Sequence, residues 1–238
     1  MFSHFARWAL QAPVSSFDQE LRLRPAHKPS DREPERDFLV GLSVGQGSQP
    51  SGVAVLERLP PPRPRDSHSY ACRYLRRWPP ARTGYPALVA DLTAMLNGTV
   101  LTGSDLVVEA GPSIRAVLPL LQKHRLRARL RPVEVKASAE DTYVDGLWRV
   151  SKASLIETAR QVLQEERLVF DEQMPPEVRA TTPSAQTIYQ ALLTYPYNKT
   201  PAANDAFASR EGADDDLILS VALACWCGER CRQILWVR

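Results

Sequence analysis

The sequence predicts an α/β fold in which a mixed five-stranded sheet carries helices on both faces. Two observations predict this class. The apolar residues first recur at a period of two, which is typical of strands, and later at a period of about 3.6, which is typical of helices. The segments also follow the order of a three-stranded antiparallel meander and then a βαβ unit.

Three apolar segments form the predicted meander. "FLVGLSV" (Phe38–Val44) and "VAVLER" (Val53–Arg58) are compact strands, and "GQGSQPSG" (Gly45–Gly52) between them is rich in turn-forming residues. The first two strands are therefore expected to form a hairpin. "SYACRYLRRW" (Ser69–Trp78) alternates well enough to be the third strand.

The βαβ unit and the closing helices follow from the change of period. The predicted helix, strand, helix and strand are Tyr85–Leu96, Asp105–Gly111, Ser113–His124 and Leu126–Ala137. Behind them come a helix over Lys152–Arg167, a short strand over Leu168–Phe170, a helix over Ser184–Pro196 and a last, almost wholly apolar helix that reaches Trp226. This order is that of the ribonuclease H fold, in which strands one and four are parallel neighbours. Their ends, Ser43 and Glu109, form a topological switch point where a site is expected.

Composition and hydropathy predict that the protein is soluble and intracellular. The 238 residues are 44% hydrophobic, which is enough for a core, and the formal charge of +3 does not by itself indicate nucleic-acid binding. No segment approaches membrane-spanning length, and the four cysteines lack the spacing of a zinc site. We expect residues 1–36 to be a polar tail or linker remnant, 37–230 the folded domain, and 231–238 a C-terminal tail.

Three carboxylates stand in a row where the last helix begins, at Asp214, Asp215 and Asp216. One of them would serve as a helix cap, because the unpaired N–H groups and the helix dipole favour negative charge. Three exceed what a cap requires, and adjacent carboxylates at the edge of a core repel each other. A divalent cation would relieve that repulsion.

Four stretches together resemble the nuclease domain of phage and prophage terminase large subunits, over most of residues 38–226. They are "FLVGLSVGQGSQPSGVAVLER", "DLVVEAGPSIRAVLPLL", "GLWRVSKASLIETARQVLQEERLVF" and "REGADDDLILSVALACW". The resemblance implies a ribonuclease H-like domain that cuts double-stranded DNA with Mg²⁺ or Mn²⁺ during genome packaging, in the cytoplasm of a bacterial host. It implies Glu109 as the second-motif ligand and Asp215 with Asp216 as the third motif, with Asp214 where the family usually has His.

The first motif departs from the family. Ser43 occupies the position of the aspartate in the first strand, and a serine hydroxyl is a neutral, weak ligand that cannot bridge two ions. We therefore predict that two-metal phosphodiester hydrolysis is impaired. The chain also has no G-x-x-x-x-G-K-[ST] motif, so a separate packaging ATPase or portal subunit is an expected partner. The alternative is a non-catalytic module that binds DNA or docks to such a subunit.

DNA contact is predicted for "KHRLRARLRP", where Arg125, Arg127, Arg129 and Arg131 alternate with apolar residues. On one strand, this period would put four guanidinium groups on one face, able to neutralise consecutive phosphates. A solvated edge strand protected by charge is an equally good interpretation of the pattern. Lys152, at a helix start where a cation is unfavourable, is a further DNA-binding candidate.

Overall fold

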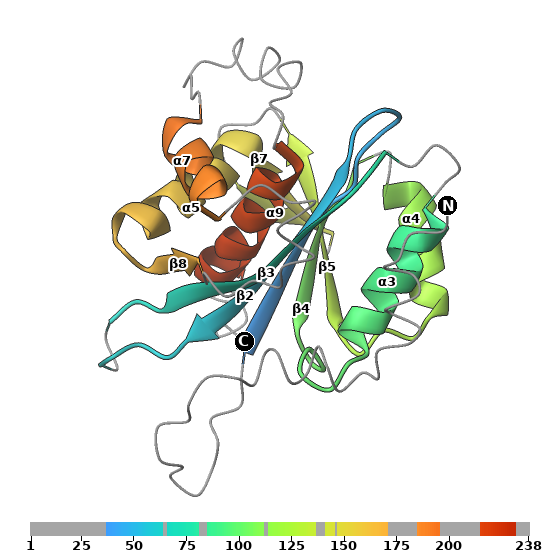
Figure 1. Cartoon of the computed structure of the whole chain (residues 1–238), viewed down its shortest axis with the longest axis horizontal. Helices are drawn as coiled ribbons and strands as arrows, with labels where there is room; N and C mark the ends of the chain where they lie inside the picture. Colours follow the sequence, from blue (N-terminus) through green and yellow to red (C-terminus); the bar gives the residue numbers. More distant parts are fainter. Residues whose placement is uncertain are drawn as a thin grey trace, which may run out of the picture.

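The computed structural model describes residues 37–63, 66–80, 85–111, 114–136, 141–145, 147–170, 185–195 and 215–231. Within these ranges, one mixed eight-stranded sheet has the strand order β6-β7-β5-β4-β1-β2-β3-β8 (Figure 1). The strands are β1 (Asp37–Ser43), β2 (Ser51–Leu59), β3 (Ser69–Trp78), β4 (Asp105–Glu109), β5 (Arg129–Lys136), β6 (Thr142–Val144), β7 (Leu147–Ser151) and β8 (Leu168–Phe170). The helices are α3 (Pro86–Leu96), α4 (Ile114–Lys123), α5 (Lys152–Gln164), α7 (Ala185–Thr194), α9 (Asp215–Trp226) and the π-helix η1 (Cys227–Cys231).

The five predicted strands form the middle of this sheet. Strands β1, β2 and β3 are an antiparallel meander, and β4 and β5 add in parallel on the other side of β1. The predicted α/β class and the parallel pairing of the first and fourth strands are confirmed. Strand β8 pairs with β3 in parallel, and the β6–β7 hairpin extends the far edge. This hairpin was not predicted, because its strands have only three and five residues and mixed polarity.

Alternate residues of β1 belong to two separate cores. Leu39 packs in a cluster with residues of α5, α7 and α9, whereas Phe38, Val40 and Leu42 pack in a second cluster with α3 and α4. This alternation is the expected consequence of the period of two in a strand. Figure 1 accordingly shows α5, α7 and α9 on one side of the sheet and α3 and α4 on the other.

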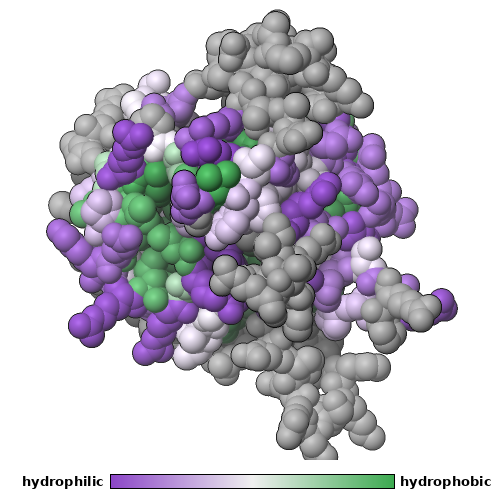
Figure 2. All heavy atoms as spheres, turned by 180° about the vertical axis from the view of Figure 1, so that it is seen from behind, coloured by the Kyte–Doolittle hydropathy of each residue, from purple (hydrophilic) through white to green (hydrophobic). Residues whose placement is uncertain are grey.

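The α3–α4 side is only partly buried. Met95, Leu118 and Leu120 lie half-covered around its core. In Figure 2, hydrophobic atoms gather on the side of the molecule that carries these two helices, among hydrophilic neighbours. Across the part of the chain that the structure describes, no helix combines the length and apolar character needed to cross a bilayer.

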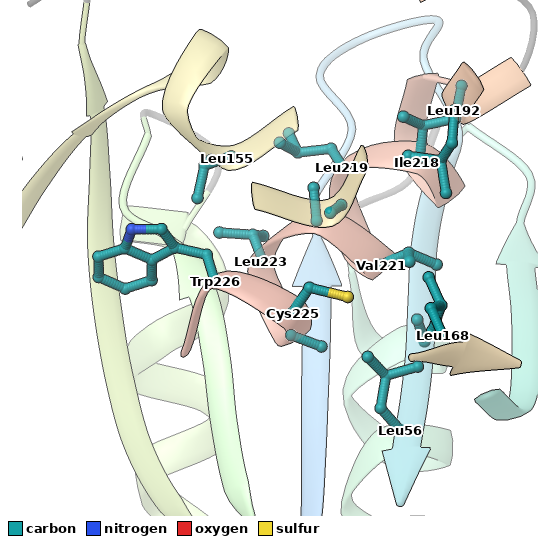
Figure 3. Packing of buried hydrophobic residues seen from close by; sticks show 14 of the residues in the cluster. Leu56, Leu155, Leu168, Leu192, Ile218, Leu219, Val221, Leu223, Cys225 and Trp226 are labelled. Carbon is teal, nitrogen blue, oxygen red and sulfur yellow. The ribbon is translucent and has the colours of Figure 1, made fainter. Parts of the chain in front are cut away.

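Helix α9 is the central element of the larger core. All its residues from Asp216 to Trp226 are buried, as its apolar sequence predicts. Figure 3 shows its side chains among those of α5, α7, β2 and β8. Its backbone approaches the sheet at Gly41 so closely that a Cβ there would overlap the carbonyl oxygen of Ser220. Glycine is therefore required on β1 for this packing.

Several element boundaries differ from the predicted ones by a few residues, and the differences at β5 and α5 have a backbone cause. Strand β5 begins at Arg129 because Arg125 has a left-handed φ of 46° and the Arg127 amide donates to the side chain of Asn97. Helix α5 ends at Gln164 because Glu166 has a φ of 57°, which cannot continue a right-handed helix.

Candidate active site

A row of residues crosses the sheet where β1 and β4 end. Leu42 pairs with Val108, so the residues that follow them, Ser43 and Glu109, lie side by side at the carboxyl ends of two parallel strands. This is the juxtaposition that the topology predicts. On the other side of β1, Ser43 pairs with Gly52.

The row lies on the face of the sheet that α9 covers. Leu39 and Val107 point into the α9 core, and residues an even number of positions further along the same strands share their face. Ser43 and Glu109 therefore both face the helix side. Arg77, which pairs with Gly52, continues the row onto β3.

Asp216, in the first turn of α9, is held by Arg77. The Nε of Arg77 donates to Oδ2 of Asp216 at 2.8 Å, and Nη2 donates to Oδ1 at 2.6 Å. The absence of a side chain at Gly52 makes room, because a Cβ there would lie 2.8 Å from the Asp216 carbonyl oxygen. Ser220 Oγ lies 2.8 Å from the carbonyl oxygen of Gly52 and 2.6 Å from that of Asp216. Both carboxylate oxygens of Asp216 are thus occupied by a protein cation.

Asp215 is paired with Lys152. The Nζ of Lys152, at the start of α5, donates to Oδ2 of Asp215 at 3.1 Å. The ring of Tyr195, directly after α7, lies beside this pair, with its centroid 5.6 Å from Nζ of Lys152. Burial disfavours the charged form of Lys152, but the interactions with Tyr195 and Asp215 outweigh it and raise the pKa of the ammonium.

Glu109 is a carboxylate of this site whose pKa departs from its ordinary value. Its burial raises its pKa, and the nearby charge of Lys152 lowers it only in part. Lys152 therefore acts electrostatically on Glu109 while it contacts Asp215 directly. The helix starts of α5 and α9 and the ends of β1 and β4 thus bring their polar groups together.

The structure brings Ser43, Glu109, Asp215 and Asp216 to the same end of the sheet. Asp214 lies outside the described residues. Within the described ranges, no group of three or more His, Cys, Asp or Glu side chains is arranged to hold a metal ion. Because Asp216 is occupied by Arg77 and Ser43 is neutral, the described donors do not fit a two-ion centre.

Tyr195 and the role of Arg77 in the site were missed by the sequence analysis. Arg77 and Asp216 are 139 positions apart, and no local pattern relates them. Tyr195 follows an amphipathic helix and precedes Pro196, so nothing in its surroundings distinguishes it from a packing residue. Only the fold makes these partners visible.

The four arginines lie away from this site. Arg129 and Arg131 each donate from Nε to the buried Oδ1 of Asp105 at 2.8 Å, at the amino end of β4. Glu109 is at the other end of β4, about 13 Å away at the usual strand rise. Placing all four arginines on one strand was wrong, because Arg125 and Arg127 precede β5 in a turn. Of the predicted DNA contacts, only Lys152 lies at the site.

Comparisons with known proteins identify the fold. The crystal structure of the large terminase nuclease from thermophilic phage G20c matches at 20% identity and a TM-score of 0.52, covering 89% of this chain and 96% of that one. Its form with bound magnesium matches at 19% identity and a TM-score of 0.51, covering 90% of this chain and 97% of that one. The manganese-soaked terminase nuclease domain of human cytomegalovirus matches at 10% identity and a TM-score of 0.51, covering 92% of this chain and 96% of that one. No family model and no curated protein sequence matches the chain. The chain therefore has the fold of terminase nuclease domains.

Proposed function

We propose that the chain is a terminase-type ribonuclease H-like domain that acts on double-stranded DNA during phage genome packaging, with its hydrolytic activity impaired by Ser43. The observation that carries the proposal is the position of Ser43 beside Glu109 at the ends of β1 and β4. In an open α/β sheet this is the expected place for a site, and the last helix directs Asp215 toward the same end.

The solved structures of the same fold support a divalent cation as the cofactor, because one contains magnesium and another was soaked with manganese. Among the residues that the structure describes, Glu109 and Asp215 are the carboxylates that remain for such an ion, with Ser43 on the strand beside Glu109. That set is too small for two ions, so an impaired enzyme is the form of the function that the residues support.

Position 43 tests the proposal directly. We would measure plasmid cleavage with Mn²⁺ or Mg²⁺ by the unaltered protein, Ser43→Asp, Ser43→Asn and Ser43→Asp/Asp215→Asn. Removing even an indirect support of a metal site costs roughly 10- to 100-fold, so Ser43→Asp should cut about a hundredfold faster than the unaltered protein. Ser43→Asn has a similar size without the charge and should not gain activity, and the double variant should lose it.

Two outcomes would contradict the proposal. Cutting by the unaltered protein as fast as by Ser43→Asp, abolished by Asp215→Asn, would mean that Ser43 does not impair the site. If Ser43→Asp folds, as judged by circular dichroism, but does not cut, the nuclease function fails. A non-catalytic module that binds DNA or docks to a separate packaging ATPase or portal subunit would then be the better proposal.

The second candidate function is this non-catalytic module. It is favoured by the ion pairs of Asp215 with Lys152 and of Asp216 with Arg77, because these carboxylates are then bound by protein cations and not by a metal ion. DNA would contact the exposed residues Arg125, Arg127 and Arg129 and the half-buried Arg131, and would reach Lys152 only at the acidic site.

Salt dependence separates these DNA contacts. Each phosphate contact contributes close to one unit to the slope of log affinity against log salt. Arg125→Gln/Arg127→Gln should therefore lower the slope for a DNA duplex by about two, whereas Lys152→Gln should leave it within about one unit. An unchanged slope in the double variant would show that Arg125 and Arg127 do not contact DNA phosphates.

A further inference from the structure

Lys152 occupies an unfavourable place for a cation. It is the first residue of α5, where the helix dipole is positive and where the side chain of Ser151 already caps the helix. Its side chain is nevertheless only 25% exposed and contacts Asp215 at 3.1 Å. The helix dipole does not explain why a cation is held here, whereas the carboxylates of Asp215 and Glu109 do.

Tyr195 is a further neighbour of the Lys152 ammonium group, beside Asp215 and Glu109. The ring centroid of Tyr195 lies 5.6 Å from Nζ, and Tyr195 is itself only 9% exposed. Arg160 of α5 fixes the end of α7 by donating to the backbone carbonyl oxygen of Tyr195 at 2.7 Å. The structure therefore packs Lys152 together with Asp215 and Tyr195. The ion pair of Lys152 with Asp215 is a partly buried contact and not a solvent-exposed one.

The charges of the described site nearly balance without a metal ion. Glu109, Asp215 and Asp216 are opposed by Lys152 and Arg77, which leaves a single formal negative charge. An aspartate in place of Ser43 would leave two. Serine at this position thus removes the charge that a divalent ion would otherwise be needed to neutralise.

We infer that Lys152 is the resident cation of this site: it pairs with Asp215 and partly offsets the charge of Glu109 in place of a divalent ion, and it competes with such an ion for them. The inference relies on the proposed function only for the location of the site. It concerns which cation the carboxylates hold, whether or not DNA is cut there.

Manganese binding to the full chain, followed by calorimetry and by the electron paramagnetic resonance of free Mn²⁺, tests the inference. Lys152→Met keeps the length and apolar stem of the side chain and removes its charge. It should bind Mn²⁺ at least about tenfold more tightly than the unaltered protein, which corresponds to about 1.4 kcal/mol. Lys152→Arg retains the charge and should bind Mn²⁺ as weakly as the unaltered protein. Lys152→Met/Asp215→Asn should lose the gain.

Equal or weaker Mn²⁺ binding by folded Lys152→Met would overturn the inference, as would a gain that survives Asp215→Asn. Lys152→Gln provides a second neutral variant if Lys152→Met does not fold. The result is independent of the cleavage assay with Ser43→Asp. That variant can fail to cut DNA while the lysine still competes with Mn²⁺, and it can cut DNA while the competition is absent.

Discussion

Arg77 and Asp216 form a two-point ion pair, with both carboxylate oxygens bonded and the side chains only 19% and 6% exposed. The pair joins β3 to the first turn of α9 across the space left by Gly52. It therefore fixes where the last helix begins, and with it the position of Asp215.

Arg77→Met should destabilise the fold by about 2 to 4 kcal/mol, because it leaves a buried carboxylate without its partner. Urea unfolding measures the change. The matched control is Arg149→Met, whose pair with Glu134 is more exposed, at 40% and 31%, so that its loss should cost less than about 1 kcal/mol. Equal losses in the two variants would show that the Arg77 pair contributes no more than a surface contact.

Gly41→Ala should prevent stable folding. The added Cβ would overlap the backbone carbonyl oxygen of Ser220, and a backbone atom in a buried helix cannot move aside cheaply. Soluble expression and the thermal unfolding midpoint measure the effect. Gly111→Ala is the control, because the nearest atom to its Cβ would be Glu109 Oε1 at 4.0 Å. A folded Gly41→Ala protein would contradict the close approach of α9 to β1.

Glu109→Gln should change how stability depends on pH. Burial raises the pKa of Glu109 in the folded protein above its ordinary value of 4.5. Its contribution to stability is therefore fully present below that value and is lost as the pH rises through the raised pKa. Glutamine lacks this loss. In buffer without divalent cations, Glu109→Gln should match the unaltered protein near pH 4 and unfold at a higher temperature near pH 7.

Glu134→Gln is the control for that experiment, with the opposite sign. The hydrogen bond from Lys136 lowers the pKa of Glu134 in the folded protein, so the carboxylate stabilises the fold above its ordinary pKa. This variant should therefore fall behind the unaltered protein as the pH rises. A gain for Glu109→Gln that is the same at every pH would contradict the assignment to its titration.

Asp105→Asn should weaken the amino end of β4. Asp105 is fully buried and accepts from both Arg129 and Arg131, so removing its charge should cost about 1 to 3 kcal/mol. Chemical unfolding measures the loss. Asp66→Asn, at an exposed position, should change the stability by less than about 0.5 kcal/mol. If the two variants unfold alike, the arginines do not depend on Asp105 for their placement.

The parts of this fold that the sequence predicts are those governed by local rules. The period of β1 and the order of the segments were enough to place Ser43 beside Glu109, because parallel neighbours end at the same edge of a sheet. The continuous apolar run of α9 was enough to predict its burial. These features depend on neighbouring residues or on a general rule of topology.

The features that could not be predicted depend on residues far apart in the chain. The partner of Asp216 is set by the register of β2 and β3 and by the room at Gly52. Tyr195 reaches Lys152 only because α7 packs on α5, where Arg160 holds its carbonyl group. The arginine pattern was misplaced for the opposite reason: a regular alternation predicted a strand where the left-handed Arg125 makes a turn.

The bond between Ser220 and Gly52 joins positions 168 residues apart, and this separation has a consequence for synthesis on the ribosome. Strands β1 and β2 are synthesised long before the helix that covers Leu39, Ala54 and Leu56. The nascent chain must carry that apolar sheet face uncovered until translation has passed Trp226. Closure of the domain is therefore a late, non-local event, and a chain stopped before α9 should be a substrate for chaperones and proteases.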